Sequence, residues 1–256
     1  MRAILTYHSI DASASPVSCD PATFERHVRW LASGRVEVTT IERLLTLPAD
    51  ADAIAITFDD GFVTVKDVAI ARLLAYGLPS TVFVVTDHAG RTNAWRGQPE
   101  RGIPHLPLLD WPALARLRED GVTLGSHSRT HPDLTRLSAS AVEDEAGGSL
   151  EMIQQKTGVR PTVFAYPYGR VDVKTAAIVA GVFRYACTTE FLALDGAVAP
   201  ARLPRLDAYY LRRPEILESW GTPAFERFVR RRWRLRWLRR AASDVVGRML
   251  SLRAAR

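Results

Sequence analysis

Residues 53–62 read AIAITFDDGF, and this stretch decides how the chain folds. Its first six residues are mostly apolar or β-branched, which predicts a short buried strand. Asp59 and Asp60 follow at the C-terminal end of that strand, where α/β barrels place their active sites. Neighbouring side chains on an extended segment point in different directions, so one carboxylate can bind a metal while the other faces a water on it. The alternative is an ordinary turn, since Asp-Asp-Gly also ends strands for structural reasons.

A pair of histidines follows a second predicted strand. Residues 122–125 read VTLG, a short strand pattern, and His127 and His131 lie four residues apart just after it. In a helix or a tight turn this spacing lets both imidazoles face one point. Two neutral imidazoles and one carboxylate form a set that suits zinc or another divalent transition metal. Two histidines on a surface helix are the alternative, although Pro132 disfavours a long helix there.

A third motif, FAYPYG at residues 164–169, completes an ordered series. Together the three motifs resemble those of the polysaccharide deacetylases, the NodB-like carbohydrate esterases of the fourth family. The resemblance extends from about Leu5 to Tyr209 and includes the region 109–134. It implies an α/β fold, the irregular (β/α) barrel with about seven strands that is typical of this family.

The resemblance also implies a role for each motif residue. The first aspartate of the pair is the family's general base, here Asp59. The metal is zinc, with cobalt or nickel as alternatives, and the ligands that correspond to the family's metal site are Asp60, His127 and His131. The third motif walls the substrate groove, and the residues that correspond to it are Tyr166, Pro167 and Tyr168. In this family the backbone amide at the position of Tyr168 helps to bind the oxyanion.

This chain departs from the family pattern at the arginine that many members carry in the third motif. That arginine orients the catalytic aspartate, but residues 164–166 contain none. We therefore expect Asp59 to be oriented in another way, and Arg205 is our hypothesis for the replacement.

A second departure concerns the general acid, which many members supply as a histidine in a late motif. No histidine follows His131 here. Residues 3–8 read AILTYH, a predicted strand that ends in His8, and a similar N-terminal Tyr-His replaces the late motif in the subgroup of poly-N-acetylglucosamine deacetylases. His8 is thus the candidate general acid. The alternative is a histidine that caps the first strand and has only a structural hydrogen bond.

Strand and helix patterns alternate along most of the chain, which predicts a parallel sheet. Strands are expected near residues 3–7, 36–39, 53–58, 81–85, 122–125, 162–166 and 184–188. Helices are expected near residues 24–31, 63–76, 112–117, 139–156 and 173–179. A chain of 256 residues with 47% hydrophobic content can form one such barrel, and we place the deacetylase domain at residues 1–212.

A long loop, residues 86–108, lies between a predicted strand and the next helix. Long loops at that end of a barrel often shape binding sites. Trp95 in this loop is a candidate for stacking on a sugar ring through its apolar face. Simple packing of the loop is the equally weighted alternative.

Cysteine content and the N-terminal sequence bear on where the chain works. Cys19 and Cys187 form no CxxC motif and no disulfide framework, so a reducing compartment is permissible. Residues 1–5 are too short for the apolar part of a signal peptide, and no stretch has transmembrane length. We therefore expect a cytoplasmic protein.

The segment 213–256 is predicted to be a basic, partly amphipathic helical tail. From residue 224 onward it holds eleven arginines and two acidic residues, a net charge of +9. Because the whole chain carries +6, the part before residue 224 carries about −3. Phe225, Val229, Trp233 and Trp237 recur every fourth residue with arginines roughly opposite. This pattern suits an anionic membrane surface at the inner face of the membrane. A solvated helix that packs a few aromatics on the barrel is the alternative, and nucleic-acid binding is disfavoured because no recognition fold is present.

The expected function is hydrolysis of an N-acetyl group from an amino sugar in a glycan or a glycan precursor. Because the tail is expected to bind a membrane, a lipid-linked sugar is a candidate substrate. Such an enzyme is a metal-dependent hydrolase acting on carbon-nitrogen bonds other than peptide bonds. Two alternatives remain open at this point: a noncatalytic carbohydrate-binding relative, and an O-acetyl esterase, since the same site would attack either carbonyl.

Overall fold

A curled parallel sheet forms the centre of the molecule in the computed structural model, which describes residues 1–97, 102–194, 196 and 198–254, with side chains through Leu238 in the last helix. The strand order is β10-β1-β5-β6-β7-β8-β9, and β4 pairs with β5 outside this path. These strands are β1 (Arg2–Tyr7), β4 (Glu37–Thr39), β5 (Ala53–Phe58), β6 (Ser80–Val84), β7 (Thr123–Ser126), β8 (Val163–Ala165), β9 (Tyr185–Cys187) and β10 (Leu206–Asp207). A separate pair is formed by β2 (Ser9–Ile10) and β3 (Ser18–Cys19).

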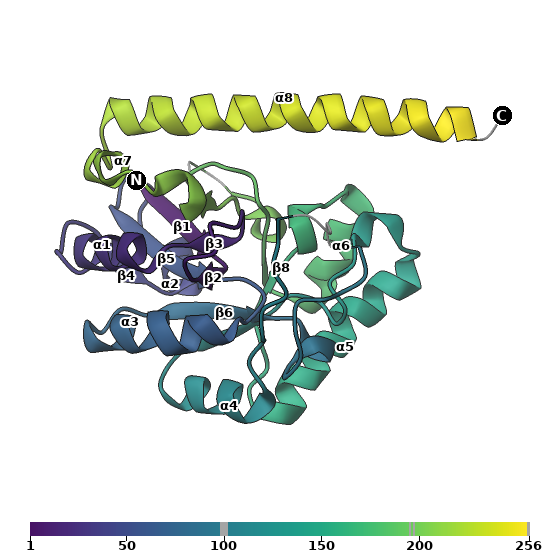
Figure 1. The fold of residues 1–256 in the computed structure, drawn as a ribbon, viewed down its shortest axis with the longest axis horizontal. Helices are drawn as coiled ribbons and strands as arrows, with labels where there is room; N and C mark the ends of the chain where they lie inside the picture. Colours follow the sequence, from purple (N-terminus) through teal and green to yellow (C-terminus); the bar gives the residue numbers. More distant parts are fainter. Residues whose placement is uncertain (98–101, 195, 197, 255–256) are drawn as a thin grey trace.

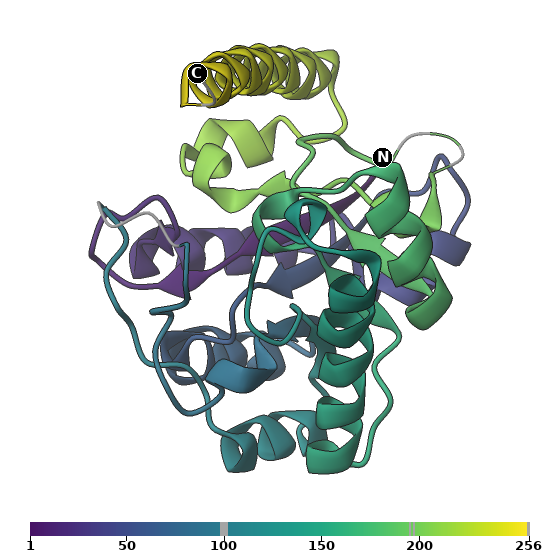
Figure 2. The same ribbon diagram turned by 90° about the vertical axis from the view of Figure 1, so that its right-hand side faces the viewer.

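Helices connect the strands and cover the sheet from outside (Figures 1 and 2). The α-helices are α1 (Pro21–Leu31), α2 (Ile41–Thr46), α3 (Ala71–Ala75), α4 (Trp111–Glu119), α5 (Ala139–Thr157), α6 (Val173–Val182), α7 (Pro214–Glu218) and α8 (Pro223–Ala254). A π-helical segment, η1 (Val65–Ile70), precedes α3, and the 3-10 turns are η2 (Thr86–His88), η3 (Leu134–Arg136), η4 (Pro167–Gly169), η5 (Pro200–Arg202) and η6 (Ala208–Leu211). Asp20, Asp110, Ser138 and Asp172 each cap a helix by accepting a backbone N–H three residues ahead.

The predicted alternation of strands and helices is confirmed, and the fold is an irregular (β/α) barrel. Each of the seven expected strands is present, and β1 and β5 have all six residues buried, as parallel strands covered on both faces require. One segment joins the two edges of the curled sheet: Leu203 pairs with Cys187 of β9, and Leu206 pairs with Leu5 of β1. Residues 203–207 therefore bridge the opening between the first and last strands.

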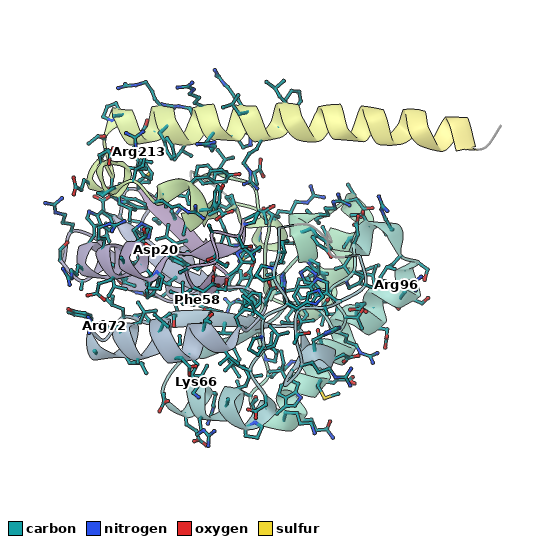
Figure 3. The ribbon with its side chains drawn as sticks, in the orientation of Figure 1. Asp20, Phe58, Lys66, Arg72, Arg96 and Arg213 are labelled. Atoms are coloured by element: carbon teal, nitrogen blue, oxygen red, sulfur yellow. The ribbon has the colours of Figure 1, made fainter. Side chains whose placement is uncertain are left out.

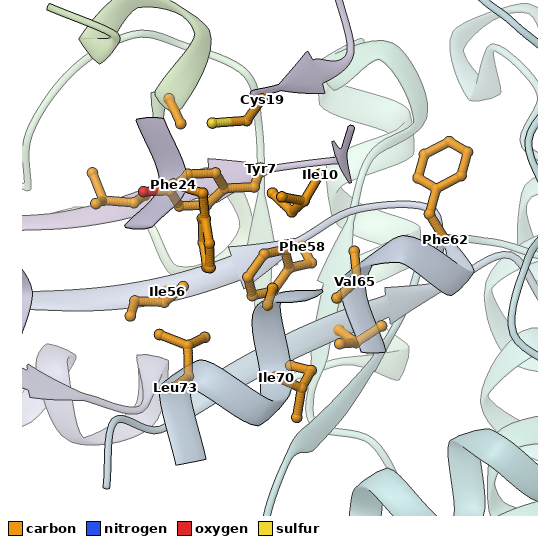
Figure 4. Packing of buried hydrophobic residues seen from close by; sticks show 14 of the residues in the cluster. Tyr7, Ile10, Cys19, Phe24, Ile56, Phe58, Phe62, Val65, Ile70 and Leu73 are labelled. Carbon is orange, nitrogen blue, oxygen red and sulfur yellow. The ribbon is translucent and has the colours of Figure 1, made fainter. Parts of the chain in front are cut away.

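Aromatic packing fixes the contact between β1, α1 and β5. The Tyr7 ring stacks on Phe58 with 5.4 Å between centroids, and Phe24 meets the edge of Tyr7 at 5.3 Å (Figure 4). Phe58 lies inside the body, whereas Lys66 and Arg72 reach its surface (Figure 3). This core holds the C-terminal end of β5 in place, and Asp59 and Asp60 follow directly from it.

The last helix, α8, lies on the outside of α7 and extends past the body at its C-terminal end (Figures 1 and 2). Phe225 and Val229 of its first turns are buried in the same core cluster as β1 and β5. Among the described residues, no helix combines the length and the apolar character needed to cross a membrane. The boundary at residue 212 stays a prediction.

Candidate active site

Asp59 and Asp60 leave β5 in different directions. The Asp59 N–H donates to the Tyr7 carbonyl at 2.9 Å, so Asp59 still follows the parallel ladder with β1. Asp60 has φ of 72°, in the left-handed region, and the next residue, Gly61, has φ of 77°. This sharp turn separates the two carboxylates, and each of them has its own set of partners.

Arg205 holds Asp59. Its two terminal nitrogens donate to the two carboxylate oxygens at 2.6 and 2.7 Å, and both side chains are almost completely buried. Burial alone would raise the pKa of Asp59, but the Arg205 guanidinium outweighs it and holds that pKa well below its usual range. Arg205 thus contacts Asp59 as hypothesised. The paired guanidinium keeps the Asp59 carboxylate anionic and fixes its orientation.

Asp60, His127 and His131 meet in one buried cluster, with one ligand atom from each within 4.8 Å of the others. Asp60 Oδ1 lies 3.5 Å from His127 Nε2 and 3.7 Å from His131 Nε2. The carbonyl of Ala165 lies 2.7 Å from His127 Nδ1 and can only accept, so Nδ1 carries the proton and Nε2 keeps its lone pair.

A divalent metal fits this cluster because the cluster is unsatisfied without one. Asp60 Oδ1 is buried, faces the Nε2 atoms of both histidines and has no hydrogen-bond partner among the described residues. Burial, followed by the nearby His127, lowers the pKa of His131 well below its ordinary value, so the imidazole is neutral, the form that binds metals. Burial also raises the pKa of Asp60, a cost that a bound cation would offset. The site can therefore hold a metal, and the structure does not determine which.

The loop that carries both histidines is held by side chains that sequence reasoning missed. Glu145 of α5 accepts the N–H groups of Arg129 and Thr130 at 2.8 and 3.0 Å and the Thr130 hydroxyl at 2.6 Å. Ser128 Oγ accepts the His131 N–H at 3.0 Å. Glu145 lies in a helical stretch without any motif, so no signal in the sequence links it to the histidines.

His8 lies next to the same carboxylate pair. Its Nε2 is 3.8 Å from Asp59 Oδ2, and its side chain is 22% exposed. The preceding residue, Tyr7, turns its ring into the core instead. The end of β1 therefore brings His8 to the open side of the Asp59–Arg205 pair, while its role as an acid stays a prediction.

The third motif lies beside the histidines, but its two tyrosines differ in position. The Tyr168 ring meets His131 edge-on with 4.6 Å between centroids. Tyr166 is fully buried, and its hydroxyl donates to the Ala201 carbonyl at 2.9 Å. Pro167 between them is buried as well. Tyr168 thus borders the site, whereas the hydroxyl of Tyr166 is used in the fold.

Trp95 comes from the long loop, of which residues 98–101 lie outside the described part of the chain. Its ring packs on His131 with 4.3 Å between centroids, and His88 meets its edge at 5.6 Å. With 7% of its surface exposed, the indole is mostly covered by protein. This position favours packing of the indole against His131, and stacking of Trp95 on a sugar stays a prediction.

Backbone strain is concentrated at this site. Five described residues other than glycine have positive φ, and four of them belong to the site: Asp60, Ser128, His131 and Tyr168. Such conformations cost about 1–3 kcal/mol each and persist where the surrounding structure enforces them. The strain supports the assignment of these residues to a functional site.

Comparison with known proteins gives a consistent result. The family model described as polysaccharide deacetylase matches residues 47–182. YxkH of Bacillus subtilis is 27% identical over 177 residues, which cover 67% of this chain and 58% of YxkH. The poly-beta-1,6-N-acetyl-D-glucosamine N-deacetylase of Staphylococcus epidermidis is 26% identical over 223 residues, which cover 81% of this chain and 69% of that protein.

Solved structures show the same fold. The Streptococcus pyogenes deacetylase PplD in complex with acetate matches with a TM-score of 0.73 at 21% identity, over 87% of this chain and 98% of PplD. At that identity the likeness concerns the fold alone. The chain spans less than two thirds of the length of YxkH.

Proposed function

The chain belongs to the polysaccharide deacetylase family, and from this premise we propose that it hydrolyses an N-acetyl group from an amino sugar in a glycan or a glycan precursor. The observation that carries the proposal is the division of labour between two adjacent carboxylates. Asp60 lies with two histidines in an unsatisfied buried cluster, while Asp59 is held by Arg205 and faces His8. A binding module would have little use for both arrangements.

The metal in this proposal is zinc, held by Asp60, His127 and His131. When bound there, such a cation supplies Lewis-acid polarisation of the acetyl carbonyl and lowers the pKa of water. Two imidazole nitrogens and the unpartnered Asp60 Oδ1 suit a borderline-soft ion with nitrogen and oxygen ligands.

The protein's own residues then handle the protons. Asp59 is anionic because of Arg205, so it can accept the proton of the attacking water. His8 Nε2 lies 3.8 Å from Asp59 Oδ2 and, when protonated, can donate to the leaving amine. The Tyr168 amide is the proposed donor to the oxyanion, and the left-handed φ of 57° at Tyr168 sets the direction of that peptide. Acetate and a free amine are the products.

The proposed substrate is an N-acetylglucosamine polymer or its precursor. The Staphylococcus epidermidis relative is named for that activity and aligns with 81% of this chain. The Tyr-His at the end of β1, with His8 beside Asp59, supports the same substrate class.

Acetate release tests the proposal. Protein loaded with zinc is incubated with N-acetylglucosamine oligomers or with a simple acetyl ester, and a chelated sample is the control. We expect chelator-sensitive acetate release from the oligomers. Release from the ester alone would indicate an O-acetyl esterase, and no release from either substrate by metal-loaded protein would contradict the proposed chemistry.

We also propose that α8 rests on an anionic membrane surface at the cytoplasmic side. Its inner face packs on the body through Phe225 and Val229. Its outer face exposes four arginines around a shallow depression: Arg227, Arg230, Arg231 and Arg234. Trp237 and Leu238 follow with 59% and 56% of their surface exposed. Guanidinium groups beside exposed apolar side chains match the charge and layering of anionic headgroups over acyl chains.

A flotation assay tests the membrane contact. Each arginine near an anionic surface contributes about 1 kcal/mol, so replacing all four by glutamine should remove most of the binding to vesicles that contain phosphatidylglycerol. The matched control removes the same charge elsewhere on the surface, at Arg35, Arg116, Arg118 and Arg160. Equal flotation of the two variants would refute a specific role for α8.

A further inference from the structure

Three residues of α8 contact one short segment of the barrel. Trp233 Nε1 donates to Glu190 Oε1 at 2.9 Å, and Arg236 donates to the Thr189 carbonyl at 3.1 Å. Phe228 packs edge-on against Phe191 with 6.1 Å between centroids. The contacted residues are consecutive and follow the C-terminal end of β9.

The same segment holds Arg205 from the other side. Arg205 Nε donates to the Thr188 carbonyl at 3.0 Å, and the Arg205 N–H donates to the Glu190 carbonyl at 2.9 Å. Because a guanidinium paired through two nitrogens has one favourable plane, the Thr188 carbonyl helps to set the plane in which Arg205 meets Asp59. A shift of this segment would therefore move the Asp59 carboxylate.

The segment also touches the third motif. Thr189 Oγ1 donates to the Tyr168 carbonyl at 3.4 Å. Gly169 has φ of 64°, and a Cβ at that position would collide with Thr189 Oγ1. The close approach requires glycine and leaves little room for Thr189 to move without disturbing Tyr168. Residues 188–191 thus lie between α8 and both parts of the site.

We propose that Trp233 and Arg236 of α8 are positioning residues, which hold residues 188–191 and, through them, Arg205 and Asp59. The outer face of α8 and this inner face belong to one rigid helix. When the outer face is held on a membrane surface, the inner face still contacts residues 188–191. The position of α8 on the membrane is therefore coupled to the orientation of Arg205 and Asp59. The consequence for turnover rests on the proposed function.

Point variants test the contact without removing the helix. Trp233→Phe keeps the aromatic ring but loses the N–H donor, and Glu190→Ala removes the acceptor. We expect each to lower kcat on soluble N-acetylglucosamine oligomers on the order of 10-fold with KM and zinc content unchanged. Glu190→Gln keeps an acceptor oxygen and should restore the rate. The double variant should be no slower than either single variant, since both remove the same contact.

Hydrogen exchange provides a readout that does not depend on activity. In Trp233→Phe we expect faster amide exchange both in residues 188–191 and in the peptides that contain Arg205 and Asp59. Glu226→Gln, at an exposed residue near the start of the same helix, is the control and should leave exchange and kcat unchanged.

The outcomes separate the two proposals. Faster exchange confined to residues 188–191, or an unchanged kcat in an active enzyme, would overturn the positioning role. If the unaltered protein releases no acetate but exchange changes reach Arg205 and Asp59, the positioning role stands and the proposed function fails.

Discussion

Two buried polar clusters, one at the end of β1 and one that follows β5 and β7, differ in how completely their hydrogen bonds are made. Tyr7 turns into the core, where its hydroxyl lies 2.9 Å from His27 Nδ1, and His27 Nε2 lies 3.0 Å from the Leu211 carbonyl. A carbonyl only accepts, so Nε2 carries the proton and Nδ1 accepts from Tyr7. At the cluster of Asp60, His127 and His131, by contrast, Asp60 Oδ1 has no hydrogen-bond partner in the described part of the chain.

This difference distinguishes a structural histidine from a ligand. Buried polar atoms without a partner cost about 1–3 kcal/mol each, and a fold retains them where something else binds them. Both ring nitrogens of His27 have a hydrogen-bond partner, whereas Asp60 Oδ1 has none among the described residues, and Asp60 and His131 have strained backbone. Exposure does not separate the two histidines, because His27 and His131 are both buried.

The largest expected effect comes from replacing one histidine on each side of this comparison. His127→Ala should lose both zinc and acetate release, because it removes a ligand. His27→Ala should keep zinc content and kcat while it lowers the melting temperature, because only core contacts and hydrogen bonds are lost. Zinc loss in His27→Ala at a temperature where the protein is folded would break the comparison.

A smaller effect is expected at His8, the sequence neighbour of Tyr7. His8→Ala should lower kcat about 10²–10⁴-fold, the range for a general acid or base, with zinc retained. Zinc analysis and acetate release on the same samples check it. Full activity in His8→Ala would show that His8 is not the general acid and would favour a purely structural role at the end of β1.

The pH dependence of stability isolates His27. Burial lowers the pKa of His27 to about 4, below the ordinary value near 6.5, so the unfolded chain takes up the proton first. The free energy of unfolding should therefore fall by about 3 kcal/mol as pH drops from about 6.5 to about 4. Denaturant titrations of His27→Asn should show a shallower dependence. An unchanged slope would mean that the pKa of His27 does not differ between the folded and the unfolded chain.

The smallest effect is stabilisation by the metal itself. Zinc at about 100 times its dissociation constant should raise the free energy of unfolding by about 2.7 kcal/mol. The same addition to His127→Ala should do much less, while His27→Asn should respond like the unaltered protein. Thermal scans with and without chelator measure all three. Equal stabilisation of His127→Ala would place the metal elsewhere.

Sequence patterns were sufficient for the strands, the main helices and the family. All seven expected strands formed, most of them short runs of apolar and β-branched residues, and the family prediction is confirmed by the match over residues 47–182. Sequence patterns did not predict contacts between residues that are far apart in the chain. Glu145 stands 15 residues from Thr130, on a helix face with no motif, and only folding brings it to the histidine loop.

Arg205 was predicted only indirectly, from the absence of the arginine expected in the third motif. A missing arginine in residues 164–166 prompted the search for a substitute, but the pairing that delivers Arg205 involves only single residues and the two-residue β10. Such short strands have no periodicity to detect. The surroundings of Trp95 could not be predicted from the sequence either. A loop tryptophan that packs on His131 has the same sequence signature as one that faces a sugar.

The segment 203–207, which joins β9 to β1, has a consequence for synthesis on the ribosome. Both histidines and both aspartates leave the exit tunnel well before Arg205, because the chain emerges from its N-terminus. Until Arg205 arrives, Asp59 has no guanidinium partner and favours solvent over its buried position. A nascent chain can thus bring Asp60, His127 and His131 together first, but Asp59 acquires its guanidinium partner only when Arg205 has been made.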